Sequence, residues 1–565
     1  MTDVDGGELL VRALRAEGID VLVSIPDIGQ SPMLRSAERA GMRLVHPRHE
    51  SAAVHLAEGY ARVSGGLAAV GAAGGPGVAN LLPGLACAWM EGWPVVAIGT
   101  QRVRRSLHAV RRGRFQYGPL LEAAVPLTKY ATRVEDPARI PEIVREAVRH
   151  ATAARPGPVY IEIPTDVMAE VVADPVDTST AGRHARPGAP DPRAVADAAA
   201  LMADAAFPLI LAGQGVSAAG ASAELRALAE RTGALVMTTA GARGVFPEDH
   251  PQSVGMTFPW GTPAHLDADV ILAVGTQLGE STQYLGPPAW AGPPAQRVIH
   301  LDADPLVIGV NRVVDVALVA DARAGLAALA EACAAQGPAR APSAAASAYA
   351  RDAQAFRIAV ADSYLAPDAP TIHPGHLAVT VARHFGDDAV ACFDGGNTTL
   401  WAHLAHVVRR PRSLLWTSHF GHLGTGLPYA LGAKLAAPER PVYLLTGDGA
   451  FGFNLQELET AAREGIAVVV VVACDFAWGM EVVHMQKAAG TNVGVRHSHV
   501  RYDEVARALG CFGARVQRPE ELGPALDDAL AAGGPAVVQV EVDPGENEQP
   551  PGLDDFVEMY AAAST

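Results

Sequence analysis

The chain has 565 residues, of which 49% are hydrophobic and 19% are charged, and its formal net charge is -17. This length is too great for one hydrophobic core and predicts three or four domains, while the composition excludes a disordered or fibrous protein. The acidic balance argues against a nucleic-acid partner, because no global positive charge attracts phosphate.

The beginning of the chain and its cysteines predict where the protein resides. The first residues, MTDVDGGELLVRAL, start with acids and pass directly into an amphipathic helix, so they do not predict a signal peptide. The longest apolar run, residues 466–474, is too short to cross a bilayer. Five scattered cysteines without metal-ligand spacing indicate free thiols in a reducing compartment. We therefore expect a cytoplasmic protein without a membrane partner.

Two segments rich in proline, alanine, glycine and serine indicate linkers, at residues 172–195 and 336–348. They divide the chain into three blocks of similar size. We expect domains over residues 1–175, 190–335 and 360–545, followed by a C-terminal tail over 546–565.

Each block alternates short apolar runs with helical patterns. This predicts an α/β fold with three doubly wound domains, each a parallel sheet covered by helices. The expected strands are VLVSIP, LAAVGAAGGPG, PVVAIGT and PVYIEIP in the first block, PLILAG, ALVMTT, DVILAVG and VIHLDAD in the second, and AVACFDGG, SLLWTSH, PVYLLTGDG, AVVVVVACD and AVVQVEVD in the third. Many of them end in Gly or Asp, so polar loops are expected at the carboxyl ends of the strands.

The third block places two acids just after the ends of two strands. Asp448 lies in a Gly-Asp-Gly turn, and Asp475 follows the next apolar run, after one helical crossover. Adjacent parallel strands would bring both acids to one rim of the sheet. Gly447 and Gly449 let the backbone approach a phosphate, and two carboxylates suit Mg²⁺ or Ca²⁺. By itself, however, a Gly-Asp-Gly sequence is more often an ordinary turn.

Further motifs accompany this pair of acids. In chain order they are GGELLVRAL, RHESAAVHLAEGYAR, GGPG, GGNTT and GTGLPYALGAK, followed by Gly-Asp-Gly. The set resembles the thiamine-diphosphate (ThDP) enzymes of the acetolactate synthase, benzaldehyde lyase and 2-hydroxyacyl-CoA lyase group, over nearly the whole chain. The resemblance implies the ThDP-binding fold, with an N-terminal pyrimidine-binding domain, a middle Rossmann-like domain and a C-terminal diphosphate-binding domain.

The resemblance also implies a role for individual residues. Glu50 would hydrogen-bond the aminopyrimidine of ThDP and so promote loss of the thiazolium C2 proton, although an isolated Glu here could also cap its helix. Leu423 would support the bent cofactor, and it could serve as a core leucine as well. The matching cofactor positions are Glu50, Gly396, Asn397, Thr398, His422, Leu423, Gly447, Asp448, Gly449, Ala450, Asp475, Trp478, Gly479 and Met480.

The metal ligands implied by the resemblance are Asp448, Asp475 and the backbone carbonyl of Ala477. Relatives usually carry Asn at the second of these positions, whereas this chain carries Asp475. An Asp is a competent ligand for a hard cation, so the site should persist. Its extra negative charge beside the diphosphate predicts an altered metal preference or a slower exchange of the cofactor.

The middle block contains GQGVSAAG, residues 213–220, after an expected strand. Such a glycine-rich loop is a weak nucleotide signal by itself. The middle domain of the family sometimes holds a nucleotide and sometimes none, so ADP or another nucleotide is a candidate here.

Four residues outside the cofactor motifs are candidates for catalysis. Gln101 ends a strand of the first block, and Gln116 follows an arginine-rich stretch. The residues 475–478, which contain the expected ligands Asp475 and Ala477, are called the metal loop below. Glu481 and His484 come one and two turns after this loop, where Glu481 could transfer a proton to or from the substrate. Its alternative role is that of an acid favoured in the first turn of a helix by the dipole. His484 could pair with it or face solvent.

Two arginine clusters bear on the choice of reaction, residues 102–115 and 409–412. They could bind the phosphates of a CoA thioester or form solvated cationic loops. On this basis the expected function is a 2-hydroxyacyl-CoA lyase that releases formyl-CoA and an aldehyde or ketone. The alternatives are an acetolactate-synthase-like carboligase or 2-oxoacid decarboxylase acting on a 2-oxoacid, and a ThDP-fold binding protein without catalysis.

The assembly and the tail follow from the same resemblance. Family members combine the first and third domains across a subunit interface, so a homodimer is the expected minimum and a homotetramer is common. The tail over residues 546–565 would cover the substrate channel as a lid, or else fray.

Overall fold

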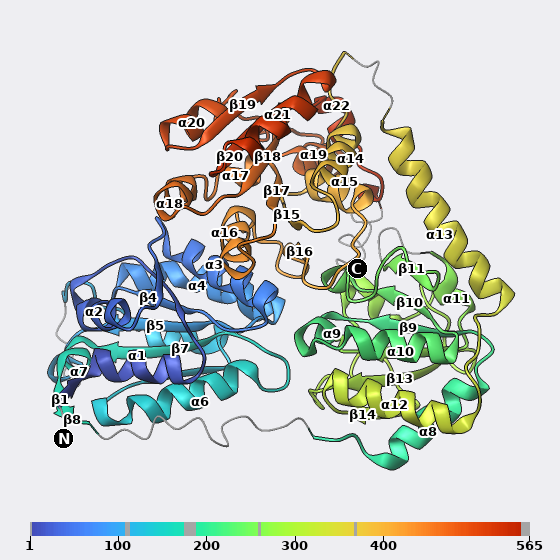
Figure 1. Ribbon diagram of the computed structural model, residues 1–565, viewed down its shortest axis with the longest axis horizontal. Coiled ribbons are helices and arrows are strands. Elements are labelled where there is room, and N and C mark those ends of the chain that lie inside the picture. The colour runs from blue at the N-terminus through green and yellow to red at the C-terminus, as the bar shows by residue number, and fades with distance from the viewer. Residues whose placement is uncertain (1–2, 108–112, 175–187, 258–261, 366–369, 555–565) are drawn as a thin grey trace.

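The computed structural model describes residues 3–107, 113–174, 188–257, 262–365 and 370–554. They form three lobes arranged as a triangle, one for each third of the chain (Figure 1). Each lobe contains one six-stranded sheet, and every strand pairing within these three sheets is parallel. The predicted α/β fold with three doubly wound parallel sheets is confirmed.

The N-terminal sheet has the strand order β3-β2-β4-β5-β7-β6. Its strands are β2 (Val21–Ser24), β3 (Arg43–Val45), β4 (Ala69–Ala72), β5 (Val96–Gln101), β6 (Tyr130–Arg133) and β7 (Val159–Pro164). Its helices are α1 (Gly6–Ala16), α2 (Ser31–Arg39), α3 (Glu50–Ser64), α4 (Pro76–Glu91), α5 (Leu120–Ala124), α6 (Ile140–Thr152) and α7 (Thr165–Ala169). A small antiparallel ribbon joins β1 (Asp3–Asp5) to β8 (Val171–Ala173) at the edge of this lobe.

The middle sheet has the order β11-β10-β9-β12-β13-β14. Its strands are β9 (Pro208–Ala212), β10 (Leu235–Thr238), β11 (Ser253–Met256), β12 (Val270–Val274), β13 (Arg297–Asp302) and β14 (Val316–Val319). Its helices are α8 (Pro192–Asp204), α9 (Gln214–Ala219), α10 (Ser222–Thr232), α11 (Ala264–Asp267) and α12 (Ala322–Gln336). The long helix α13 (Ala344–Ser363) then runs along one side of the molecule from the middle lobe to the C-terminal lobe (Figure 1).

The C-terminal sheet has the order β16-β15-β17-β18-β20-β19. Its strands are β15 (Val390–Asp394), β16 (Leu414–Leu415), β17 (Val442–Gly447), β18 (Val469–Cys474), β19 (Phe512–Val516) and β20 (Ala536–Glu541). Its helices are α14 (Pro374–Phe385), α15 (Asn397–Ala405), α16 (Gly426–Ala436), α17 (Asp448–Phe451), α18 (Glu457–Glu464), α19 (Gly479–Ala489), α20 (Tyr502–Ala508), α21 (Pro519–Ala531) and α22 (Pro544–Asn547).

The N-terminal and C-terminal lobes share one hydrophobic core. Helix α3 crosses α16 there, and side chains from both lobes, such as Val54, Leu56 and Leu431, belong to the same buried cluster. Two glycines make the close crossing possible. A Cβ atom built at Gly432 would lie 2.1 Å from the Leu56 carbonyl oxygen, and one at Gly59 would lie 2.6 Å from the Tyr429 carbonyl oxygen. The two lobes therefore form one packed unit rather than two loosely joined domains.

The structure bears on several further expectations. Every strand predicted from an apolar run is present, whereas β3, β6, β11, β14 and β19 were missed, and each of these lies at a sheet edge in the strand orders above. Among the described residues no helix is long and apolar enough to span a membrane. Residues 175–187 of the expected first linker and 555–565 of the tail lie outside the described residues.

Candidate active site

The candidate site lies where the strand order of the C-terminal sheet changes direction, between β15 and β17. In doubly wound sheets, ligands bind in the crevice that opens at this point. The loop after β15 contains Gly395 and Gly396, whereas Gly447 ends β17 and Gly449 lies in the following short helix α17. A cavity of about 1190 Å³ lies against both segments, and it extends to the corresponding switch point of the middle sheet, beside Gly215 and Gly275.

Asp448 and Asp475 are brought together as the sequence predicts. Asp448 directly follows β17 and Asp475 directly follows β18, the neighbouring strand, and both line the cavity. Both side chains are buried. Burial, and then the nearby Asp475 carboxylate, raise the pKa of Asp448 to about 8, and burial also raises the pKa of Asp475. Two mutually repelling buried carboxylates are stabilised by a bound cation.

Backbone donors hold this pair in place. One Asp448 oxygen accepts a hydrogen bond from Phe476 N (2.9 Å) and the other from Gly449 N (2.9 Å), while Asp475 Oδ1 accepts one from Ala477 N (3.1 Å). Phe476 has a positive φ of 57°, which turns the chain sharply after the acid. Ala477 also lines the cavity. The three residues that match the metal ligands therefore lie on two adjoining, well-anchored loops.

The first turn of α15 lies beside these acids. Gly396, Asn397 and Thr398 line the cavity, and the two polar side chains are buried. Asn397 Oδ1 has no hydrogen-bond partner among the described residues. At Gly449 a Cβ atom would lie 2.9 Å from the Trp478 ring, so this position requires glycine. An oxygen-rich donor set, unpaired buried polar atoms and a glycine-lined approach fit a diphosphate with a divalent cation.

The other residues expected on this side also line the cavity: Leu423, Ala450, Trp478, Gly479, Met480, Glu481 and His484. Most of them belong to the start of α19, which begins directly after the metal loop. His484 Nε2 is buried without a hydrogen-bond partner among the described residues, so it could accept or donate a bond to a ligand. Glu481 is exposed to the cavity at the first turn of α19.

The residues expected from the N-terminal domain lie elsewhere. None of Glu50, Gln101 and Gln116 is among the described residues that line the cavity. Glu50 begins α3 and accepts a hydrogen bond from Asn80 Nδ2 (3.0 Å). A Cβ atom at Gly77 would lie 3.2 Å from Glu50 Oε1, and one at the nearby Gly75 would lie 2.8 Å from Gln116 Cα. Glu50 and Gln116 thus form a second group around this glycine loop.

Two further predicted residues occupy other surroundings. Gln101 is buried and donates to Glu162 Oε2 (3.0 Å). His422 is not among the described residues that line the cavity and instead packs edge-on against His55, with ring centroids 4.9 Å apart. Burial and then His55 lower the pKa of His422 to about 4, so its ring is neutral at pH 7. Within one chain the structure therefore assembles the diphosphate half of the expected site and leaves Glu50 apart from it.

Sequence reasoning missed Asn547, Glu91 and Asp394, all of which line the cavity. Asn547 Nδ2 donates to Asp475 Oδ2 (2.7 Å). Glu91, at the end of α4, accepts hydrogen bonds from the backbone of Ser418–Phe420. Asp394 accepts one from Gly426 N at the start of α16 (2.8 Å), and burial raises its pKa to about 7. Only the position of Asp394 at a strand end could have been noticed in the sequence.

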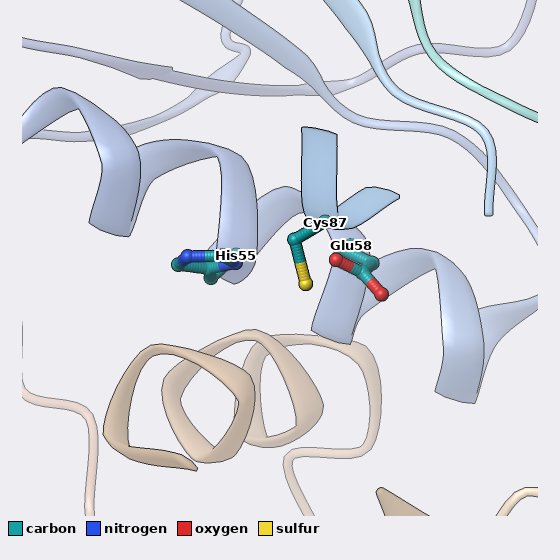
Figure 2. A group of neighbouring side chains, drawn as sticks. All are labelled: His55, Glu58 and Cys87. Carbon is teal, nitrogen blue, oxygen red and sulfur yellow. The ribbon is translucent and has the colours of Figure 1, made fainter. Parts of the chain in front are cut away.

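A second group of possible metal ligands lies outside the cavity. The side chains of His55, Glu58 and Cys87 point toward one another between α3 and α4, with potential ligand atoms within 4.8 Å of one another (Figure 2). Glu58 already pairs with Arg62 Nη2 (2.6 Å). Burial and then Glu58 raise the pKa of the Cys87 thiol, which disfavours the thiolate that a metal requires. The group is best explained as a polar core that joins two helices.

Comparison with known proteins identifies the family. Three domain models of thiamine pyrophosphate (that is, thiamine diphosphate) enzymes match the chain: the N-terminal TPP binding domain over residues 4–120, the central domain over 195–329 and the C-terminal TPP binding domain over 394–540. The chain is 31% identical over 566 residues to a probable acetolactate synthase large subunit of Methanocaldococcus jannaschii, covering 96% of this chain and 92% of that protein. The chain belongs to the ThDP enzymes of the acetolactate synthase group.

Two more relatives carry the same kind of name. An acetolactate synthase of Mycobacterium bovis is 34% identical over 553 residues, covering 94% of this chain and 87% of that protein. The acetolactate synthase large subunit of Parasynechococcus marenigrum is 33% identical over 568 residues, covering 97% and 89%. Asp448 and Asp475 themselves lie in the lobe matched by the C-terminal TPP binding domain.

These relatives overturn the prediction of a 2-hydroxyacyl-CoA lyase, because proteins similar over most of the chain are named acetolactate synthase. The prediction was wrong because cofactor motifs are common to both reactions. Some of the arginines that favoured a CoA thioester are also paired with acids of this chain. Arg104 pairs with Asp166 and Glu170, and Arg409 pairs with Asp249. Residues 108–112 of the first cluster lie outside the described residues.

Proposed function

We propose that this protein is a ThDP-dependent carboligase that removes CO₂ from one 2-oxoacid and joins the remaining fragment to the carbonyl carbon of a second. The observation that carries the proposal is the buried Asp448–Asp475 pair at the switch point of the C-terminal sheet, in a chain whose full-length relatives are named acetolactate synthase. Acetolactate has five carbons, which two three-carbon 2-oxoacids supply after the loss of one CO₂. Pyruvate is accordingly the first substrate to test.

Different residues of the cavity would bind the metal ion and the diphosphate of the cofactor. Asp448, Asp475 and the Ala477 carbonyl would bind Mg²⁺ or Ca²⁺, while Asn397 and Thr398 would bind the diphosphate. Bound ThDP supplies a nucleophilic carbon and an electron sink for the bond that breaks. Leu423 and the apolar parts of α19 would exclude water from the reacting atoms.

Glu481 is the candidate for proton transfer at the substrate oxygen, since it faces the cavity at the first turn of α19. His484 lies one turn further along the helix and has an unpaired nitrogen among the described residues, so it could bind the substrate carboxylate. A carboxylate in the cavity also supports the second candidate function, a 2-oxoacid decarboxylase, in which the fragment is protonated and released as an aldehyde.

Two copies of the chain would complete the site. Glu50 and Gln116 lie together around the glycine loop of the N-terminal domain, apart from the cavity of the same chain. We propose a homodimer, or a homotetramer made of two such dimers, in which Glu50 of one subunit meets the ThDP held by the C-terminal domain of the other. Glu50 would then hydrogen-bond the aminopyrimidine and keep the proton acceptor of the cofactor in place.

A nucleotide is proposed for the middle-domain part of the cavity. Gly215 and Gly275 line it at the switch point of the middle sheet, and Asp302 lies there at the end of β13. One Asp302 oxygen accepts a hydrogen bond from Asp304 N (2.9 Å), and the carboxylate could accept a further one from a ribose hydroxyl. Chromatography of the small molecules released from denatured purified protein would identify ADP or a larger nucleotide, and an empty protein that gains no stability from added nucleotides would contradict this proposal.

The stoichiometry of products separates the two candidate reactions. The protein is incubated with ThDP, Mg²⁺ and pyruvate, and CO₂, acetolactate and acetaldehyde are measured. A carboligase yields one CO₂ and one acetolactate for two pyruvates, whereas a decarboxylase yields one CO₂ and one acetaldehyde for each pyruvate. Glu481→Gln should lower turnover about 100-fold or more if Glu481 transfers a proton. No CO₂ from pyruvate or from other small 2-oxoacids would refute both functions.

A further inference from the structure

The C-terminal segment that follows β20 reaches back into the metal loop through one residue. Asn547 is the last residue of α22 and is 3% exposed. Its Nδ2 donates to Asp475 Oδ2 (2.7 Å), and its backbone carbonyl accepts a hydrogen bond from Asn397 Nδ2 (2.8 Å). Asn547 therefore connects the acid at the second metal position with the residue expected to contact the diphosphate.

The two oxygens of Asp475 have different partners. Oδ1 faces the backbone of its own loop, through Ala477 N, whereas Oδ2 faces the Asn547 amide. A Cβ atom at Gly479 would lie 2.5 Å from Asp475 Oδ2 and 3.5 Å from Asn547 Nδ2, so the pair fills the space left by this glycine. Both residues of this contact are buried, although both also line the cavity.

The position of Asn547 is itself fixed. Asp543 caps α22 by accepting hydrogen bonds from Gly545 N (2.9 Å) and Glu546 N (3.2 Å), and Asn547 N donates to the Asp543 carbonyl (3.0 Å). Asn547 Oδ1 has no partner among the described residues. The amide group is consequently held on a short, capped helix and is oriented by the carboxylate that it contacts.

We infer that Asn547 is a positioning residue for the second candidate metal ligand, and that its amide satisfies the carboxylate oxygen of Asp475 that its own loop leaves unpaired. An asparagine ligand has one oxygen for the cation and no second oxygen to satisfy. The carboxylate has an additional buried oxygen, and the Asn547 amide supplies the donor that this oxygen requires. The same bond ties the C-terminal segment to the metal loop. The inference rests on the proposed ThDP and metal site.

The test titrates Mg²⁺ into protein with saturating ThDP and follows tryptophan fluorescence, since Trp478 lies in the metal loop. Asn547→Ala is expected to weaken Mg²⁺ binding about tenfold, because a charged acceptor loses its donor. Asn547→Leu, which has a side chain of similar size but no donor, should weaken it to a similar extent. In the Asp475→Asn background the Asn547→Ala change should weaken Mg²⁺ binding by less than about threefold, since no carboxylate oxygen then loses its donor.

Glu546→Ala is the matched control, because the exposed side chain of the neighbouring Glu546 pairs with His373. This variant should bind Mg²⁺ as the wild type does. If Asn547→Ala and Asn547→Leu bind Mg²⁺ within about twofold of the wild type, the inference is wrong. If Asn547→Ala is equally harmful in the wild-type chain and in the Asp475→Asn background, the residue acts only as a general structural support, and the inference is wrong as well.

A second readout does not depend on bound cofactor. Hydrogen exchange of the segment 544–554 in the metal-free protein should be faster in Asn547→Ala than in the wild type, since the bond to Asp475 anchors this segment. Unchanged exchange would contradict the anchoring part of the inference. Wild-type protein that binds neither ThDP nor Mg²⁺ would instead overturn the proposed function, and exchange would still report on the Asn547–Asp475 contact.

Discussion

Replacing Glu91 by glutamine should lower the stability of the folded protein and weaken the binding of ThDP. The Glu91 side chain is 1% exposed, and it accepts hydrogen bonds from Ser418 N (3.0 Å), His419 N (2.8 Å) and Phe420 N (3.0 Å). Arg62 Nη2 lies 3.3 Å from the same carboxylate. The acid thus joins the end of α4 to the loop that leads to Leu423 in the cavity wall.

The size of the loss follows from these contacts. Glutamine has one acceptor oxygen, so its NH₂ group would face donors, and the buried Arg62 would lose part of its compensation. Removing one partner from a buried ion pair typically costs about 3–5 kcal/mol of unfolding free energy. We expect a loss of about 3–5 kcal/mol for Glu91→Gln, measured by urea denaturation of the metal-free protein at constant m value. ThDP binding should weaken as well, because the loop through Ser418–Phe420 lines the cavity.

The direction of the pKa shift of Glu91 predicts how its stabilisation of the folded protein changes with pH. Burial alone would raise the pKa of Glu91, but the hydrogen bond with His419 and the charge of Arg62 outweigh it and lower the pKa below its ordinary value of 4.5. The stabilisation is therefore complete above this ordinary value and is lost as the pH falls toward the lower pKa of the folded state. The difference between the wild type and Glu91→Gln should shrink as the pH falls from about 5 to about 3.

A matched control is Glu142→Gln, because Glu142 forms a fully exposed pair with Arg139 and should show little or no change. The reasoning would be refuted if Glu91→Gln lost less than about 1 kcal/mol, the range of surface pairs. It would also be refuted if the loss were undiminished in an Arg62→Met background, since the two charges are expected to be coupled.

Three further outcomes are expected. Glu50→Gln should lower turnover about 100-fold or more with ThDP still bound, and unchanged turnover would remove Glu50 from the mechanism. Gly432→Ala should cost about 2–3 kcal/mol in denaturation experiments, because its Cβ would lie 2.1 Å from the Leu56 carbonyl oxygen, whereas Gly523→Ala, with no atom within 4 Å, should be neutral or slightly stabilising. Burial and Asp475 raise the pKa of Asp448 from 3.8 to about 8. As the pH increases toward 8, the unfolding free energy of the metal-free protein should therefore fall and its Mg²⁺ affinity should rise. An Asp448→Asn protein in which both quantities depend on pH as in the wild type would contradict this.

The central strands could be predicted from the local sequence, whereas most edge strands could not. The central strands β17 and β18 are continuous buried apolar runs, which predict a strand wherever they occur. The strand β6, with the sequence YATR, is half-buried throughout, and β14 exposes two of its four residues. Edge strands like these are defined by a neighbour on one side only, so their own residues carry a weak signal.

The type of reaction could not be predicted from the sequence, for a different reason. The motifs around Glu50 and Asp448 are expected to serve the cofactor, so they do not separate enzymes that cleave carbon–carbon bonds from enzymes that join them. The arginine clusters gave a misleading indication because their ion pairs with acids distant in sequence, such as Arg409 with Asp249, exist only in the folded chain. Charge runs of this kind are usually explained by their partners in the tertiary structure.

The sequence by itself determined three parallel-sheet domains and the two acids at strand ends, because apolar periodicity and strand ends are local properties of the chain. Only the tertiary structure decided what surrounds those acids. Asn547 meets Asp475 across 72 positions of sequence, and Glu91 meets Ser418 across 327. Such contacts depend on how sheets and helices pack against one another. The structure likewise separates Glu50 from the cavity of its own chain, which no local pattern could reveal.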